Sequence, residues 1–419
     1  MKNKILIVLT CLPLFCNAQV KLPIGFLDYM ERVREKNLTY AAEKLNIPIS
    51  QADVQAAKVF NDPSISFEYA NNDDHNMQMG QGYSLELSKT FSLGKRRARV
   101  DLAKSEKDLS TALLNDFFRN LRADATIAYL QAIKQTQQYE VTLNSYNSIN
   151  NLATADSIKF MLGKITEVDA MQSNVEAGVM RNELLQAQSD LYRSYSALNI
   201  PLGQFSADTL YIPIGKLEIA DRIFEQGELL ATAINNRADL VAALKNVDIA
   251  KKSLKLAKRE RNMDFDVVLG YNYNTQVRNE LAPAPKFNGV TIGVSIPLKF
   301  SNFNKGTVHS AQFKVAQTQN YYEQAELEVK TQVAQNYSDY TLLCSQVERF
   351  NTGMLERAKA VITGKIYSYN RGETSLLEVL NAQRTYNEVR ALYIETLFNN
   401  ACALVTLEQS VGIWDIEIK

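Results

Sequence analysis

Few side chains in this sequence could carry out catalysis or hold a metal. The two histidines, His75 and His309, lie far apart, and the chain contains no GxSxG, P-loop or HExxH pattern. The segment His75-Asn-Met77-Gln-Met79 places an imidazole and two thioethers on alternate residues, a ligand set that suits Cu(I) or a similar soft ion. An ordinary polar loop explains this pattern better. We therefore predict neither an enzyme nor a cofactor, and keep His75, Met77 and Met79 as a metal-site hypothesis.

A second group of polar side chains surrounds a glycine near the C-terminal end. Gly372 suits the left-handed residue that ends a helix, and Ser375 can cap the helix that follows. Glu378, three residues later, would complete a capping box. The same glycine, hydroxyl and acid occur 209 residues earlier, at Gly163, Thr166 and Asp169. The sequence therefore predicts two copies of one helical hairpin tip.

The N-terminus predicts export from the cytoplasm. Lys2 and Lys4 precede a short apolar run, and Cys16-Asn17-Ala18 forms a small-residue cleavage site. The apolar run is too short to span a bilayer. We expect a signal peptide at 1–18, and Phe15 before Cys16 argues against lipidation.

Charge and cysteine content narrow the range of partners. The chain has 46 basic and 46 acidic residues and no basic tail, so we expect no nucleic acid partner. Beyond the signal peptide only Cys344 and Cys402 remain, too few for a disulfide framework. They would lie nearly level in a hairpin folded about Gly372. Two small residues packed in a helix interface, or a single disulfide bridge, would both fit that position.

Alternating apolar and polar residues predict four strands, at about 64–70, 82–91, 265–274 and 289–299. Each has the length of about ten residues and the in/out alternation typical of a tilted outer-membrane strand. Very long helices flank them. Residues 95–162 contain neither glycine nor proline, which predicts one uninterrupted helix of about 100 Å. A second long helix is expected from about 302 to 369.

The elements recur in the same order. The offset between copies grows from about 200 residues before the strands to about 210 after them, which places an insertion in an exposed loop at 274–288. Beyond the signal peptide, we expect a first repeat at 19–215, a second repeat at 216–411 and a C-terminal tail at 412–419. The hairpin tips are expected at about 160–166 and 369–375.

Four strands cannot close a barrel, and an open edge in lipid leaves backbone groups unpaired. The chain must therefore oligomerise. A dimer would give eight strands around a filled interior, whereas a trimer would give twelve strands around an open lumen. The sequence predicts a mainly α-helical protein with a transmembrane β-barrel, located in the outer membrane with helices extending into the periplasm.

These features resemble the TolC-like outer membrane efflux factors. The resemblance rests on the duplicated helix-strand-strand-helix plan, Asn236-Arg-Ala-Asp-Leu240, Phe91-Ser-Leu-Gly-Lys-Arg-Arg-Ala-Arg99 and Tyr369-x-x-Gly372-x-x-Ser375. It implies a homotrimer with a twelve-stranded barrel and an α-helical tunnel whose tips dock a periplasmic membrane-fusion adaptor and an inner-membrane pump. Such a protein is the exit duct for metal cations or drugs. The 91–99 stretch is most similar to members paired with heavy-metal-exporting pumps of the RND type.

The resemblance also implies residue roles. The family closes the tips through an acid after the first tip, a tyrosine before the second and a basic residue after it. Asp169 and Tyr369 match, but Thr374 stands at the basic position, where Arg371 or Lys365 could substitute. Asp169 could equally be only a cap, and Tyr369 only a packing residue. The expected gate and docking residues are Gly163, Thr166, Asp169, Tyr369, Arg371, Gly372, Ser375 and Glu378.

Two other functions remain open. The duct could serve a type I protein secretion system, or the chain could be a periplasmic coiled-coil structural protein without a channel. Lys95, Arg96, Arg97 and Arg99 would lie just below the barrel. There they would pair with acids or with outer-membrane lipid headgroups, or contribute to selectivity.

Overall fold

The computed structural model describes residues 20–76, 78–204, 209–217, 222–298, 303–416 and 418. The predicted signal peptide and Met77 lie outside these residues. The chain forms two compact units, and each combines segments of both sequence repeats. We call Ala42–Phe117 with Ile234–Thr331 the strand unit, and the chain up to Ala41 with Phe118–Ala233 and Gln332–Lys419 the tip unit. The prediction of a mainly α-helical fold with antiparallel strands is confirmed.

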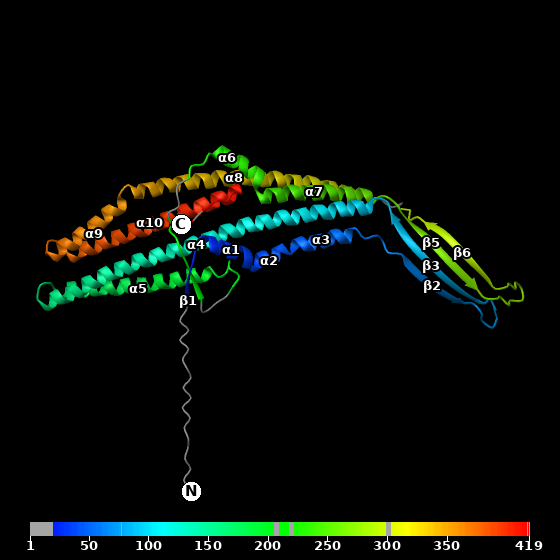
Figure 1. Ribbon diagram of the computed structural model, residues 1–419, viewed down its shortest axis with the longest axis horizontal. Coiled ribbons are helices and arrows are strands. Elements are labelled where there is room, and N and C mark those ends of the chain that lie inside the picture. The colour runs from blue at the N-terminus through cyan, green and yellow to red at the C-terminus, as the bar shows by residue number, and fades with distance from the viewer. Residues whose placement is uncertain are drawn as a thin grey trace, which may run out of the picture. The chain divides into compact units, whose positions relative to one another are not determined.

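The strand unit contains one antiparallel sheet in the order β2-β3-β5-β6 (Figure 1). Its strands are β2 (Ser64–Asn71), β3 (Gln81–Ser92), β5 (Asp264–Asn274) and β6 (Phe287–Ser295). Pairing of β3 with β5 joins the hairpins of the two repeats. β6 ends at Ser295, before the expected end at 299. The reason is Pro297, which has no N–H to donate to a neighbouring strand.

The two faces of this sheet differ sharply in polarity. One face carries apolar rows in register, such as Ile65, Leu87, Leu269 and Ile292. These side chains are exposed, Ile292 to 76 %. The opposite face is lined mainly by Ser, Thr, Asn, Asp and Glu, with glycines in β5 and β6. The exposed apolar face therefore has no covering within the described residues.

Aromatic rings mark both ends of the apolar face. Tyr83 lies between Tyr69 and Tyr273 at the loop end, with centroid distances of 5.1 and 6.3 Å. At the helix end Phe91 stacks on Phe265 at 5.4 Å. Aromatic belts of this kind flank the apolar band of transmembrane barrels.

Long helices lead away from the sheet. α4 (Lys95–Met161) is one unbroken helix of 67 residues, which confirms the predicted long helix. In the strand unit it packs with α7 (Ala238–Arg259), held by the Lys255–Asp101 ion pair at 2.8 Å. The remaining helices of the strand unit are the last residues of α2 (Leu38–Lys44), α3 (Asn46–Ala57) and the first part of α8 (Lys305–Asn351).

The second long helix is not continuous, so that prediction is wrong at one point. α8 ends at Asn351 and α9 (Met354–Asn370) begins after Gly353, which has a φ of +95°. Glycine is the residue that adopts this left-handed conformation at little cost. The equivalent position of the first repeat lies within the unbroken α4.

The tip unit contains a second, two-stranded parallel sheet that the sequence did not predict. β1 (Val20–Ile24) pairs with β4 (Thr209–Pro213), and the Tyr129 hydroxyl lies 2.8 Å from the Ile24 carbonyl oxygen. The unit also contains α1 (Phe26–Lys36), α5 (Glu167–Ala197), α10 (Leu376–Val411) and most of α6 (Gln226–Asn236). Cys344 and Cys402 are both free thiols, so the bridged alternative is not the one found.

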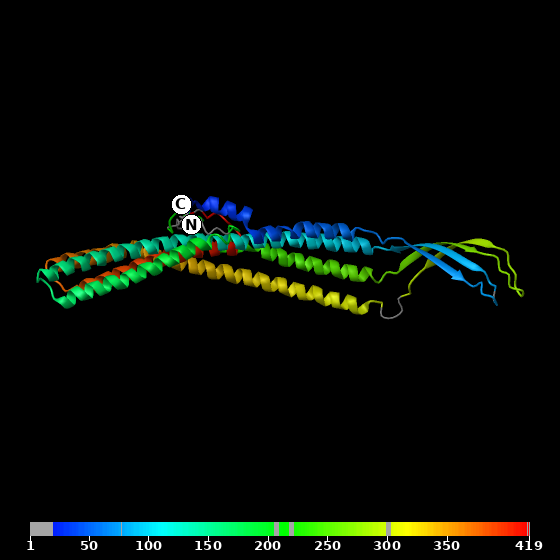
Figure 2. The ribbon, with the colours of Figure 1, turned by 90° about the horizontal axis from the view of Figure 1, so that it is seen from below.

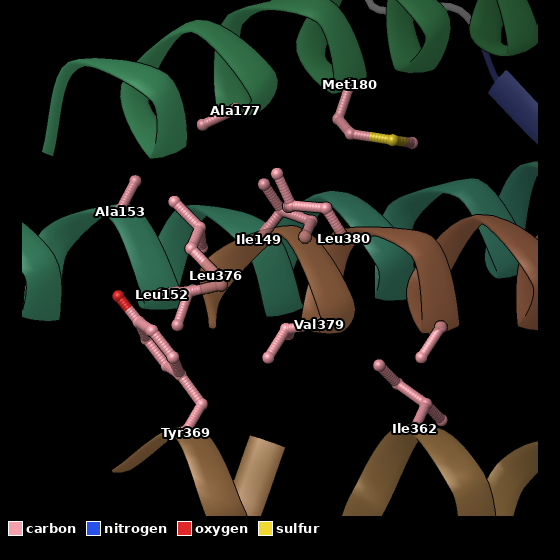
Figure 3. Packing of buried hydrophobic residues seen from close by; sticks show 11 residues of the cluster. Ile149, Leu152, Ala153, Ala177, Met180, Ile362, Tyr369, Leu376, Val379 and Leu380 are labelled. Atoms are coloured by element: carbon pink, nitrogen blue, oxygen red, sulfur yellow. The ribbon is translucent and has the colours of Figure 1, made fainter. Parts of the chain in front are cut away.

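Two helical hairpins form the free end of the tip unit. α4 lies beside α5 and α9 beside α10 (Figures 1 and 2). A buried apolar cluster joins all four helices, including Ile149, Met180, Ile362 and Leu380 (Figure 3). Within the described part of the chain, no helix has both the length and the apolar character that crossing a bilayer requires.

Candidate functional site

The two predicted tips have the same backbone geometry. Gly163 and Gly372 have φ values of +64° and +76°. In each tip the N–H after the glycine bonds to the carbonyl five residues back, at 2.8 and 2.9 Å. The glycine N–H bonds to the carbonyl three residues back, at 2.8 and 3.0 Å. This is a Schellman motif, which requires the left-handed residue that glycine supplies.

The caps of the following helices differ between the tips. Thr166 accepts the Asp169 N–H at 3.1 Å and donates its hydroxyl to the Asp169 carboxylate at 2.7 Å. Ser375 makes no side-chain capping bond, so the capping box predicted in the second tip is wrong. Its acid, Glu378, instead accepts hydrogen bonds from Lys365 at 2.5 Å and Thr374 at 2.6 Å. These two donors hold the pKa of Glu378 below its ordinary value.

Tyr369 meets an acid that lies before the first tip. Its hydroxyl donates to Asp156 Oδ1 at 3.0 Å, and the Asp156 side chain is fully buried. Figure 3 shows the Tyr369 hydroxyl pointing from α9 toward α4. Asp169, the acid predicted for this role, instead accepts a hydrogen bond from the Thr166 hydroxyl. The tyrosine therefore joins the two hairpins, but through Asp156.

Lys159 supplies the positive charge beside this pair. Its Nζ lies 3.2 Å from Asp156 Oδ1, 4.3 Å from the Tyr369 ring centroid and 3.4 Å from Asn370 Oδ1. The two cations predicted to substitute at Thr374 have other partners. Arg371 pairs with Glu373 at 2.8 Å, and Lys365 pairs with Glu378.

Asp156 and Lys159 were not predicted, although the sequence holds a signal for the first. Asp156 and Lys365 occupy equivalent positions, 209 residues apart, with opposite charges. The two copies of the hairpin therefore differ in charge at this position. This difference would have marked the last turns of α4 for closer study.

Burial dominates the electrostatics of this cluster. Burial, then the bond to Asp156 and the charges of Asp156 and Asp169, raise the pKa of the Tyr369 hydroxyl well above its ordinary value. The tyrosine therefore stays protonated and can only donate to the acid. Asp156 Oδ2 is buried and accepts no hydrogen bond from the described residues. An acid held this way depends strongly on its two remaining partners.

A groove of about 810 Å³ separates the two tips. Lys159, Thr166 and Asp169 line it from the first hairpin, and Tyr369, Arg371 and Ser375 from the second. The tips present different surfaces beside it. Met161, Leu162 and Val168 of the first tip are 75, 68 and 71 % exposed. In the second tip the equivalents of Met161 and Leu162 are the polar Asn370 and Arg371, and only the equivalent of Val168, Leu377, is an exposed apolar residue, at 58 %.

The metal-site hypothesis gains no support from this geometry. Across the described ranges, no group of three or more His, Cys, Asp or Glu side chains could hold a metal ion. His75 and Met79 lie in the loop between β2 and β3, while Met77 is outside the described residues. His309 is exposed on α8.

Comparison with known proteins identifies similar chains along almost the whole length. Residues 229–413 match the family model described as outer membrane efflux protein. The cobalt-zinc-cadmium resistance protein CzcC of Cupriavidus metallidurans is 22 % identical over 378 residues, covering 90 % of this chain and 86 % of that protein. Outer membrane protein TolC of Vibrio cholerae is 22 % identical and covers 76 % of this chain and 70 % of that protein.

The fold has solved counterparts. The structure of CusC, reported in connection with transmembrane channel formation, superposes with a TM-score of 0.75 at 14 % identity. The match covers 92 % of this chain and 91 % of CusC. At this level of identity, the likeness establishes a shared fold.

Proposed function

Because this chain is a TolC-like outer membrane efflux protein, we propose that it forms the exit duct of a tripartite system that exports metal cations. An inner-membrane pump of the RND type would deliver the cations through a periplasmic adaptor. Two lines support this substrate class. A relative across most of the chain is named for cobalt, zinc and cadmium resistance. The polar face of the sheet is also acidic.

The duct is proposed to be a homotrimer. In the sheet order β2-β3-β5-β6 the outer strands β2 and β6 each have one partner, so both edges are available for pairing. Lipid contact would leave these edge groups without hydrogen bonds, at a cost of several kcal/mol for each. Three copies would make twelve strands, a number that encloses a lumen. The exposed apolar face would then contact lipid and the polar face would line the lumen.

The acidic polar face is the observation that carries the cation proposal. Glu68, Glu86, Asp264 and Asp266 all project from it, and no lysine or arginine of the four strands does. Lys95, at the start of α4, neutralises Asp264 at 2.6 Å. Each protomer would thus contribute three acids without an opposing cation from the strands. Rings of carboxylates favour cations in channels.

Ion selectivity in planar bilayers tests this proposal. We expect the assembled protein to give a reversal potential that favours cations under a salt gradient. The double variant E68Q/E86Q should lower that preference, whereas E31Q/E35Q, which removes two exposed acids of α1, should retain it. An anion-selective or unselective wild-type channel would contradict the proposal.

The function in the cell separates efflux from secretion. Deletion of the gene should lower tolerance of divalent transition-metal ions, and the wild-type gene should restore it. Unchanged metal and drug tolerance together with loss of a secreted protein would favour a type I secretion duct. A chain that is extracted without detergent would instead favour a periplasmic structural protein.

The tips are proposed as the gate and the adaptor-docking end. Tyr369, Asp156 and Lys159 would hold the second hairpin against the first in the closed state. The exposed apolar side chains of the first tip would contact the adaptor. Gly163 and Gly372 support this role by fixing the turns, together with Thr166, Asp169, Arg371, Ser375 and Glu378 around the groove.

A further inference from the structure

The strand unit has basic side chains without acidic partners at the point where the sheet meets the helices. We call this group, Lys58, Arg96, Arg259 and Arg261, the collar. Lys58, Arg259 and Arg261 are exposed and Arg96 is partly exposed. In the part of the chain that the structure describes, none of the four forms an ion pair with a carboxylate. Lys95, close by, differs because Asp264 neutralises it at 2.6 Å.

Arg96 is held in place by an aromatic ring. Its guanidinium carbon lies 4.0 Å from the Phe60 ring centroid, and Nη1 donates to the Lys58 carbonyl oxygen at 2.8 Å. Phe60 itself is 65 % exposed. Guanidinium groups carry five N–H donors, so most of those on Arg96 are left for a ligand. Stacking fixes the plane of the group before any ligand arrives.

Arg259 is the last residue of α7, and Arg261 lies in the turn between α7 and β5. This turn packs against the turn between β3 and α4. Asn262 donates to the Leu93 carbonyl oxygen at 3.2 Å, and Arg259 Cδ lies 3.6 Å from where a Cβ on Gly94 would be. The Arg261 guanidinium lies 5.9 Å from the Phe303 ring centroid. Two turns from different repeats therefore bring these arginines together.

The collar adjoins the end of the exposed apolar face. Phe91 and Phe265 form the last aromatic pair of that face, and Leu93, two residues further on, is 60 % exposed. An amphiphile with its chains along this face would place its headgroup at the collar. Guanidinium groups bind phosphate through paired N–H donors and bear a charge at every physiological pH.

We propose that the collar binds the phosphate of anionic phospholipids in the membrane leaflet nearest the helices. This inference rests on the proposed membrane position of the sheet, and it adds a lipid-binding site to it. Apolar contact and charge act together there, because the acyl chains meet Phe91, Leu93 and Phe265 while the phosphate meets the arginines. Free phosphate has no acyl chains, so only the charge interaction with the arginines would favour its binding.

Lipid binding can be measured on the purified, assembled protein. Thermal unfolding in a neutral detergent is followed during titration with short-chain phosphatidylglycerol, phosphatidylcholine or inorganic phosphate. We expect phosphatidylglycerol to raise Tm in a saturable manner, and the other two to have much smaller effects. R259A/R261A should weaken the apparent affinity for phosphatidylglycerol on the order of tenfold or more, because each basic residue near an anionic surface contributes to binding.

Two further variants make the test specific. R181A/R193A removes two exposed arginines of α5 and should respond like the wild type. R259K/R261K keeps the charge but removes the paired donors, and should bind with intermediate affinity even if the alanine variant folds poorly. Equal responses of wild type, R259K/R261K and R259A/R261A, or a response to inorganic phosphate as large as to lipid, would overturn the inference.

Channel recordings separate this inference from the proposed function. We expect wild type and R259A/R261A to give equal single-channel conductance in phosphatidylcholine bilayers. If channels form in these bilayers but phosphatidylglycerol does not raise Tm, the lipid-binding role of the collar would be rejected and the proposed duct would stand. Absence of channels in any bilayer would reject the proposed duct, and the collar with it.

Discussion

The hydrogen bond from Tyr369 to Asp156 joins the two hairpins near their tips. The acid is fully buried, and its partners come from both sides: Tyr369 from the second hairpin and Lys159 from its own helix. A hydrogen bond to a charged group contributes about 1.5–3 kcal/mol. Loss of the tyrosine hydroxyl removes the partner of Asp156 that comes from the second hairpin.

We expect Tyr369→Phe to favour the open state of the duct. The ratio of closed to open channels should fall by about tenfold, which corresponds to about 1.4 kcal/mol. Single-channel recordings in planar bilayers would measure this ratio as the fraction of time that each channel is open. Tyr367→Phe is the matched control, because Tyr367 is 61 % exposed and, among the described residues, its hydroxyl accepts a hydrogen bond from Arg371 alone. Unchanged gating in Tyr369→Phe would leave this tyrosine with a packing role.

Glu408 predicts an unusual dependence of stability on pH. Its side chain is fully buried beside Arg222 at 3.0 Å, and it accepts the Asp415 N–H at 3.1 Å. Burial outweighs the attraction of Arg222 and raises the pKa of Glu408 to about 8, from an ordinary 4.5. Between these values the folded chain keeps a proton that the unfolded chain has released. This contribution to stability is therefore present at low pH and lost as pH rises toward 8.

The comparison of wild type with Glu408→Gln measures that contribution. Other carboxyl groups change stability in the opposite direction, so the expected result is a difference between proteins. From pH 5 to pH 8 the Tm of the wild type should fall relative to that of Glu408→Gln by about 2 °C or more. Parallel curves would show that Glu408 is ionised throughout.

The sequence predicted some of these residues and missed others for physical reasons. Gly163 and Gly372 could be found because a left-handed turn is a local requirement. The acid that meets Tyr369 depends on how α9 packs against α4, and no local pattern records this contact. Glu378 left its predicted cap because Lys365, on the preceding helix, offers a stronger, charged donor.

Elements whose signal is local were predicted well. Strict alternation located the apolar and polar faces of the strands, and the absence of glycine and proline located α4. The break before α9 was missed because a single glycine costs a helix only about 1 kcal/mol and is often tolerated. The parallel pair of β1 and β4 depends on segments far apart in the sequence, in contact only after folding.

Gly203 fixes how the end of α5 meets the end of α1. Its φ is +62°, and a Cβ there would collide with the Lys36 carbonyl oxygen and lie 2.9 Å from the carbonyl carbon. Asn37 secures the same contact by donating to the Pro201 carbonyl oxygen at 3.0 Å. Backbone atoms cannot move aside as a flexible side chain would, so a side chain at this position must displace a helix end.

We expect Gly203→Ala to destabilise the protein by about 3 kcal/mol, from left-handed strain of about 1 kcal/mol and the collision with backbone. Chemical denaturation followed by circular dichroism would measure the loss. Gly163→Ala is the matched control, since its φ of +64° imposes the same strain but a Cβ there meets nothing within 4 Å. Equal losses for the two variants would mean that the contact with Lys36 relaxes without cost.

At the scale of the whole molecule, the unlike faces of the sheet require a partner. A single chain exposes large apolar side chains on one face, Ile65 and Ile292 among them at 73 and 76 %. It also presents acids on the other face and two unpaired edges. A monomer in water would expose the apolar face to solvent. A monomer in lipid would leave the backbone groups of both edges without hydrogen bonds. A closed barrel in the membrane would place the apolar face against lipid and the acidic face against water, and would pair both edges.

Two adjacent residues of β6 can distinguish the face proposed to contact lipid from the face proposed to line the lumen. Ile292 lies on the apolar face and Thr291 on the polar face. A lysine on the lipid face costs about 2–4 kcal/mol near the membrane centre, in each copy. We expect Ile292→Lys to reduce the yield of assembled trimer severely, as measured by gel electrophoresis without heating.

Thr291→Lys should assemble at the wild-type yield and lower the cation preference in planar bilayers, because its charge would face the lumen. Similar yields for the two variants would contradict the assignment of the faces, since only one of these charges would meet lipid.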